Sequence, residues 1–160
     1  DGGTADGGGE GGSSGGGEDG SSSGTDGGPS GADCSTDFLN FSASISDSDG
    51  PCSSPCDADD VLTYHLVIEN TSLSDCVLVS STTCLIEDVQ IDVDVVHDVP
   101  PAETYSPSCG EAVTEHIIPA GGSVEDSLEG GVLGAGNYIA IINTPMDSVL
   151  ATGTKAFTVE

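Results

Sequence analysis

Five aspartates crowd one short polar stretch of the chain, and carboxylates at this density have the chemistry of a cation site. They are Asp47, Asp49, Asp57, Asp59 and Asp60. Calcium takes six to eight oxygen ligands, and a carboxylate-rich loop can wrap around the ion. Asp47-x-Asp49-Gly50 has the opening pattern of a calcium loop, but the glutamate that closes such a loop is absent. Because carboxylates also cluster by chance in an acidic chain, we interpret the stretch as a solvated surface and keep calcium as the alternative.

Six cysteines are suited either to disulfides or to a metal or redox centre. They are Cys34, Cys52, Cys56, Cys76, Cys84 and Cys109. A structural zinc site needs two closely spaced ligand pairs, and only Cys52 and Cys56 are close in sequence. A redox centre needs Cys-x-x-Cys, which the chain lacks. We therefore expect three disulfides; 15 pairings are open, and our preferred set is Cys52–Cys56, Cys76–Cys84 and Cys34–Cys109.

Three histidines are the other side chains suited to proton transfer or transition-metal binding: His65, His97 and His116. His97 precedes Asp98, and a histidine beside a carboxylate can move protons. No nucleophile or oxyanion donor accompanies it in a recognisable pattern. We interpret the three histidines as ordinary strand or rim residues, and we expect no enzymatic activity.

Composition excludes two classes of partner. The formal net charge is −27, from 28 acidic residues against one lysine and no arginine. Nucleic acids and anionic membrane surfaces are bound by clustered basic residues, which this chain cannot supply. No apolar run approaches the ~20 residues of a membrane helix. Partners that remain are cations, basic protein surfaces, neutral glycans and other copies of the chain through strand edges.

Several features indicate a location outside the cytoplasm. The even cysteine count favours an oxidising compartment, and a first residue of Asp1 favours removal of a leader. A lipid anchor on a residue upstream of Asp1 is an extension of this hypothesis. Asn40-Phe41-Ser42 and Asn70-Thr71-Ser72 match the N-glycosylation pattern, and we expect Asn70 to be accessible at a strand end.

The first 33 residues differ from the rest of the chain. Fifteen of them are glycine, and none is an aliphatic residue larger than alanine. Such a segment cannot bury enough apolar surface to offset its chain entropy, so we predict an acidic linker that is disordered or ordered only in an assembly. We divide the chain into this tail, residues 1–33, and a disulfide-linked domain, residues 34–160.

Within the domain, apolar and polar residues alternate with the two-residue period of half-buried strands. The clearest run is 60–72, in which Leu62, Tyr64, Leu66 and Ile68 share one face. Further strands are predicted near residues 39–45, 75–84, 85–99, 112–118, 124–128, 137–143 and 154–159. We expect 75–84 to be a short edge strand, and 137–143, which is apolar on both faces, to be central. Seven or eight short strands joined by turns predict an all-β fold of two packed antiparallel sheets.

Two stretches carry a resemblance to a known class of domain. Residues 62–71 end an apolar strand with Asn-Thr, and residues 118–124 form a proline-glycine turn before Leu133-Gly134-Ala135-Gly136-Asn137-Tyr138. The pattern resembles the immunoglobulin-like modules of prokaryotic cell surfaces, including the CARDB and BsuPI-like types, over about residues 36–160. The chain departs from these modules in its six cysteines, and it has no tryptophan. The resemblance implies a β-sandwich that acts as a spacer, adhesive domain or assembly subunit.

We therefore expect a non-enzymatic extracellular module that is structural or adhesive and is tethered through its acidic tail. One alternative is a subunit of an extracellular filament or sheath linked by strand-edge addition, with residues 154–159 as the donor strand. A second is a calcium-dependent adhesion domain, with no other cofactor.

Overall fold

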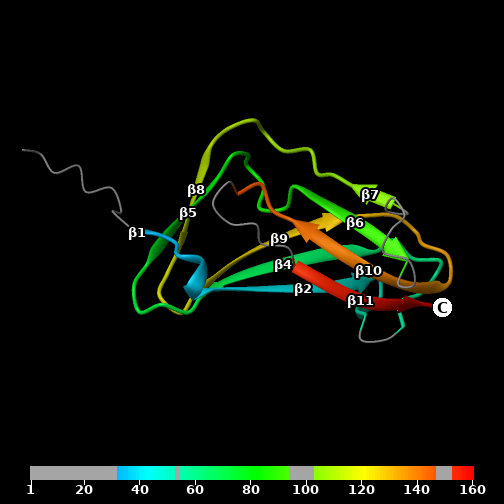
Figure 1. Cartoon of the computed structure of the whole chain (residues 1–160). Coiled ribbons are helices and arrows are strands. Elements are labelled where there is room, and N and C mark those ends of the chain that lie inside the picture. Colours follow the sequence, from blue (N-terminus) through cyan, green and yellow to red (C-terminus); the bar gives the residue numbers. More distant parts are fainter. Residues whose placement is uncertain (1–31, 53–54, 94–102, 147–152) are drawn as a thin grey trace, which may run out of the picture.

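The computed structural model describes residues 32–52, 55–93, 103–146 and 153–160. These residues form eleven strands and a single-turn 3-10 helix (Figure 1). The elements are β1 (Ala32–Asp33), η1 (Thr36–Phe38), β2 (Leu39–Asp47), β3 (Gly50–Pro51), β4 (Thr63–Asn70), β5 (Cys76–Ser80), β6 (Asp88–Val93), β7 (Glu103–Tyr105), β8 (Thr114–Ile118), β9 (Ser123–Glu129), β10 (Gly136–Asn143) and β11 (Gly153–Val159).

Two four-stranded antiparallel sheets form a β-sandwich. One sheet has the strand order β3-β2-β4-β9, and the other has the order β11-β10-β6-β7. Figure 1 shows the two sheets as layers, with β2 and β4 in one and β6 and β10 in the other. The predicted all-β sandwich is confirmed.

The strand order is that of an immunoglobulin-like sandwich. If β2, β4, β6, β7, β9, β10 and β11 are taken as strands A, B, C, C′, E, F and G, the two sheets are A-B-E and G-F-C-C′. A third sheet, β1-β5-β8, is an addition to this plan. In chain order, β5 lies between strands B and C, and β8 lies between strands C′ and E.

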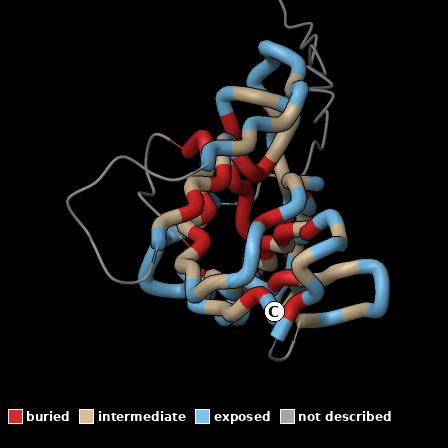
Figure 2. Tube along the Cα trace, turned by 90° about the vertical axis from the view of Figure 1, so that its right-hand side faces the viewer, coloured by how far each residue is buried: buried red, intermediate tan, exposed pale blue. Residues whose placement is uncertain are grey.

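The core lies between the two large sheets. Tyr64, Leu66 and Ile68 of β4 are fully buried, as the two-residue period predicts. They share one core cluster with residues of the facing sheet, which include Val89 and Ile91 of β6. Figure 2 shows the buried residues gathered inside the trace and the exposed ones on its outer turns. Burial of the β4 face therefore holds the two sheets together.

The strand predictions were correct for the eight longer strands and missed three short ones. β4 lies inside its sheet between β2 and β9, and β10, predicted to be central, lies between β11 and β6. β5 lies in the middle of the third sheet, so its prediction as an edge strand is wrong. β1, β3 and β7 have only two or three residues each, too few to show a period.

Two of the predicted segments, the tail and the strand over 85–99, lie partly outside the described residues. The tail prediction falls on residues 1–31, which lie outside the described part, whereas Ala32 and Asp33 pair in parallel with Cys76 and Val77 of β5. The strand predicted over 85–99 is described only as β6, because residues 94–102 also lie outside.

The disulfide pairing corrects our preferred set. The structure contains Cys52–Cys56, as expected, but its other disulfides are Cys34–Cys76 and Cys84–Cys109. The Cys76–Cys84 and Cys34–Cys109 pairs are wrong. β1 lies beside β5 and so brings Cys34 to Cys76. A strand of two residues is too short to show a sequence period, so this pairing could not be predicted from the sequence.

Asn70 joins the third sheet to the sandwich. Its side chain is fully buried at the end of β4, and its Nδ2 donates to the carbonyls of Ser74, Ile118 and Pro119 at 2.8, 3.1 and 3.2 Å. Its Oδ1 accepts from the Ser72 N–H at 2.9 Å. The prediction that Asn70 is accessible is therefore wrong for the folded domain, because the amide that would carry a glycan is enclosed.

We predict that Asn70→Ala lowers the free energy of unfolding by about 3 kcal/mol, because it leaves several buried backbone groups without partners. Urea denaturation measures the change. Asn40→Ala is the matched control, since Asn40 is exposed on β2, and we expect a change within about 0.5 kcal/mol. Equal losses in the two variants would contradict the bridging role of Asn70.

Tyr64 and Tyr105 stack where the two large sheets meet. Their ring centroids are 5.9 Å apart, and a side chain at Gly130 would come within 2.5 Å of the Tyr64 ring. The Tyr64 hydroxyl is buried and has no hydrogen-bond partner among the residues that the structure describes. Burial, and secondarily the Tyr105 hydroxyl, raises the pKa of Tyr64 above its ordinary value of 10.0.

The raised pKa of Tyr64 predicts a loss of stability in alkali. The folded state keeps the tyrosine proton that the unfolded state loses, so stability is full below pH 10 and falls above it. Tyr64→Phe should flatten this fall in denaturation curves between pH 9 and 12. At pH 7 it should change stability by less than about 1 kcal/mol, because no hydrogen bond is lost.

Tyr138→Phe is the contrasting variant. The Tyr138 hydroxyl donates to the Gly134 carbonyl at 2.9 Å, so its removal should cost about 0.5–1.5 kcal/mol at pH 7. A larger loss from Tyr64→Phe than from Tyr138→Phe would show that the Tyr64 hydroxyl has a partner in solution.

Candidate functional site

An acidic hollow lies where the end of β2, the following loop and the end of β11 meet. Its volume is about 320 Å³, and its charged lining consists of Asp47, Asp49, Asp57 and Glu160. Pro51, Pro55 and the Cys52–Cys56 disulfide complete the wall. Gly50 allows the tight turn out of β2, because its φ of 127° is a conformation that L side chains rarely adopt.

Backbone N–H groups orient the carboxylates of this loop. Asp47 Oδ1 accepts from Asp49 N at 3.1 Å, and its Oδ2 accepts from Asp57 N at 3.3 Å. Asp57 Oδ1 accepts from Asp59 N at 2.9 Å. A carboxylate has about four lone-pair positions, so these bonds leave acceptor capacity toward the hollow.

The structure brings together three of the five predicted aspartates. Asp47, Asp49 and Asp57 line the hollow, but Asp59 and Asp60 do not. Asp60 instead ties the loop to the β2–β3 turn, since its carboxylate accepts from the backbone N–H and the hydroxyl of Ser48.

Sequence reasoning missed Glu160, which comes from the far end of the chain. Cys56 N donates to Thr158 O at 2.8 Å, and Glu160 N donates to Cys56 O at 3.0 Å. These bonds lay the loop against the outer edge of β11. No pattern near Glu160 points to a loop a hundred residues earlier, so only the fold could reveal its place.

The hollow offers oxygen ligands and no thiolate. Asp47 lies close enough to Cys52 and Cys56 for the three to resemble a metal cluster. The two sulfurs are joined in a disulfide, however, and a metal binds the thiolate form of cysteine. The chemistry available here is therefore that of a hard cation such as calcium, which oxygen ligands suit.

His65 and His116 lie beside β9 and line two separate hollows, of about 320 and 300 Å³, which share Glu125 and Asp126. His65 Nε2 is 2.8 Å from Ser46 Oγ, whereas His116 Nε2 is buried and has no hydrogen-bond partner in the described part of the chain. His65 is half-buried on the outer face of β4. His97 lies outside the described residues.

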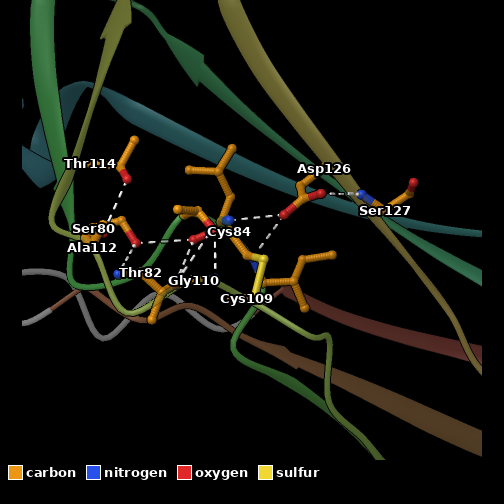
Figure 3. Close-up of a disulfide and its surroundings, with 12 residues drawn as sticks. Ser80, Thr82, Cys84, Cys109, Gly110, Ala112, Thr114, Asp126 and Ser127 are labelled. Atoms are coloured by element: carbon orange, nitrogen blue, oxygen red, sulfur yellow. Dashed lines mark hydrogen bonds between the residues drawn. A yellow bond between two sulfur atoms is a disulfide. The ribbon is translucent and has the colours of Figure 1, made fainter.

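Asp126 anchors the residues that directly follow Cys84, one of the two cysteines of the Cys84–Cys109 disulfide (Figure 3). Its Oδ2 accepts from the backbone N–H groups of Leu85 and Ile86 at 2.8 and 3.2 Å. Because this carboxylate is committed to backbone donors, we interpret Asp126 as structural and not as an acid or base.

Two further predicted features have clear positions in the fold. Asn40 is exposed on β2, so glycosylation there stays a prediction. β11 pairs with β10 along its whole length, from Gly136↔Val159 to Ile142↔Gly153. It could donate itself to a neighbour only by leaving its own sheet.

Comparison with known proteins does not extend these observations. No family model matches the chain, and no curated protein matches it significantly. In the part of the chain that the structure describes, no helix has the length and apolar character needed to cross a membrane.

Proposed function

We propose that the protein is a non-enzymatic extracellular module, structural or adhesive, that is tethered through its acidic N-terminal stretch. The observation that carries the proposal is the junction between that stretch and the domain. Directly after residue 31, Ala32 and Asp33 of β1 pair with β5, and Cys34 is then joined to Cys76 by a disulfide. A tether has to transmit load to the domain, and this disulfide attaches the base of the N-terminal stretch covalently to β5.

The remaining support comes from the cysteines and the charge. All six cysteines are in disulfides, which persist in oxidising compartments. The full-chain charge of −27 keeps the protein in solution and favours a neutral glycan or a basic protein surface as the adhesive partner. The resemblance to prokaryotic immunoglobulin-like surface modules agrees with this role.

The tether can be tested on intact cells with a glutamate-specific protease. Glu10 and Glu18 lie in the N-terminal stretch, so cleavage there should release a domain that begins at Gly11 or Asp19 into the medium. Mass spectrometry identifies the released fragment and its three disulfides. A protein that is cut only after lysis would contradict an extracellular location.

The same released material separates the module from the filament alternative. A tethered module should elute as a discrete monomer in size-exclusion chromatography. Regular fibres in negative stain would instead favour a subunit linked through strand edges.

The acidic hollow supports calcium-dependent adhesion as a second candidate function. Asp47, Asp49, Asp57 and Glu160 come from two distant parts of the chain and face one space. A bound cation would join the β2–β3 region to the end of β11 and would relieve the repulsion between these carboxylates.

Calcium binding predicts thermal stabilisation by mass action. For a dissociation constant of about 10⁻⁴–10⁻³ M, 10 mM calcium adds about 1.4–2.7 kcal/mol to the free energy of unfolding. Asp47→Asn should abolish the rise in Tm, and Glu111→Gln, which removes one exposed charge elsewhere, should not. An equal rise with magnesium at the same ionic strength would indicate general screening and remove this candidate.

A further inference from the structure

The three disulfides divide the chain into closed loops and open segments. Cys34–Cys76 closes a loop with a sequence separation of 42, and Cys84–Cys109 closes a second loop with a separation of 25. The loops follow one another without overlap. Cys52–Cys56, with a separation of 4, lies inside the first loop.

Each loop encloses strands of the sandwich. The first contains β2, β3 and β4, and the second contains β6 and β7. The strands between and after the loops are β5, β8, β9, β10 and β11. A disulfide is a covalent shortcut, so tension applied at the two ends of the chain passes across each bond and does not stretch the enclosed segment.

The shortcuts lead through the third sheet. Tension that arrives at Cys34 crosses to Cys76, the first residue of β5, and leaves β5 toward Cys84. From Cys84 it crosses to Cys109 and continues to β8, which pairs with β5 from Cys76↔Ile118 to Ser80↔Thr114. The added sheet therefore lies at the root of the N-terminal stretch.

Neighbouring hydrogen bonds hold the second shortcut in place. Thr83 N donates to Gly110 O at 3.1 Å, and Gly110 N donates to Thr83 Oγ1 at 2.8 Å, so the residues beside Cys84 and Cys109 are also paired. Ser80 and Thr82 donate their hydroxyls to the Cys84 carbonyl at 3.0 and 3.2 Å (Figure 3).

The ends of the described chain suit a load along the molecule. β1 and the end of β11 lie at opposite ends of the structure in Figure 1. A tether attached before β1 and a partner bound to the sandwich would therefore pull across its length.

We propose that the β1-β5-β8 sheet and its two disulfides form a load-bearing root, which carries tension from the N-terminal stretch past β2–β4 and β6–β7. This inference rests on the proposed tether. It assigns the third sheet, which the immunoglobulin-like plan does not need, a mechanical role.

The experiment is force-clamp stretching of the whole oxidised chain, with handles at its two ends, followed by addition of a phosphine reductant to the extended molecule. Reduction of Cys34–Cys76 should lengthen the chain in one step of roughly 130 Å, because Cys52–Cys56 still closes a short stretch inside that loop, and reduction of Cys84–Cys109 should add roughly 80 Å, at about 3.3–3.6 Å per residue. The step for Cys52–Cys56, roughly 10 Å, should appear only after the 130 Å step, because that bond carries no tension until its enclosing loop opens.

Matched variants identify each step without depending on a fragile fold, since the chain is already extended when the bonds are read. Cys52→Ser/Cys56→Ser should lose the short step and lengthen the Cys34–Cys76 step to roughly 140 Å. Cys84→Ser/Cys109→Ser should lose only the 80 Å step. A first step of roughly 220 Å, the length released by a Cys34–Cys109 bond whose loop still contains closed Cys52–Cys56 and Cys76–Cys84 bonds, would overturn the proposed path.

The outcome is independent of where the protein resides. If the extended chain shows the expected steps but the protease never releases the protein from intact cells, the covalent path stands and the proposed tether is wrong. Surface release together with wrong steps would keep the proposed function and remove the load-bearing root.

Discussion

The main constraint on this fold is that it must accommodate many carboxylates with almost no positive charge. Twenty-eight acidic residues share one lysine, so carboxylates cannot be neutralised by ion pairs within the chain. The described domain uses backbone N–H donors in their place. Asp47, Asp57 and Asp60 accept them in the loop after β2, Asp75 accepts from Ala120 N at 3.0 Å, and Asp126 accepts from Leu85 and Ile86. Hydrogen bonds to carboxylates are charge-assisted, so acidic side chains here order loops that would otherwise repel one another.

The same lack of positive charge makes the three disulfides important for the stability of the fold. Repulsion among the many carboxylates opposes the compact state, and buried apolar surface, hydrogen bonds and disulfides offset it. In the chain-entropy model each disulfide stabilises by ~2–4 kcal/mol, most for the longest loop. The longest loop begins at Cys34, at the edge of the domain, so the bond that contributes most to stability also fastens the N-terminal stretch.

The third sheet connects stability with the proposed role. Asn70 joins it to β4 through buried hydrogen bonds. Cys34–Cys76 joins its strand β5 to the residue that follows β1, and Cys84–Cys109 joins the segment after β5 to the segment before β8. An immunoglobulin-like sandwich is complete without this sheet. Its position between the N-terminal stretch and the sandwich therefore favours a function in attachment and not in folding alone.

Local pattern in the sequence determined the class of the fold. The two-residue alternation in runs such as 62–68 identified the longer strands and their buried faces, because side-chain period and burial are local properties of an extended chain. The excess of cysteines indicated disulfides, and the aspartates after β2 marked the loop where three of them gather. Tertiary structure alone decided which distant residues meet. It paired Cys34 with Cys76, buried Asn70 and brought Glu160 to the acidic hollow. These contacts depend on strand pairing between segments far apart in the chain, and a one-dimensional pattern carries no record of which segments those are.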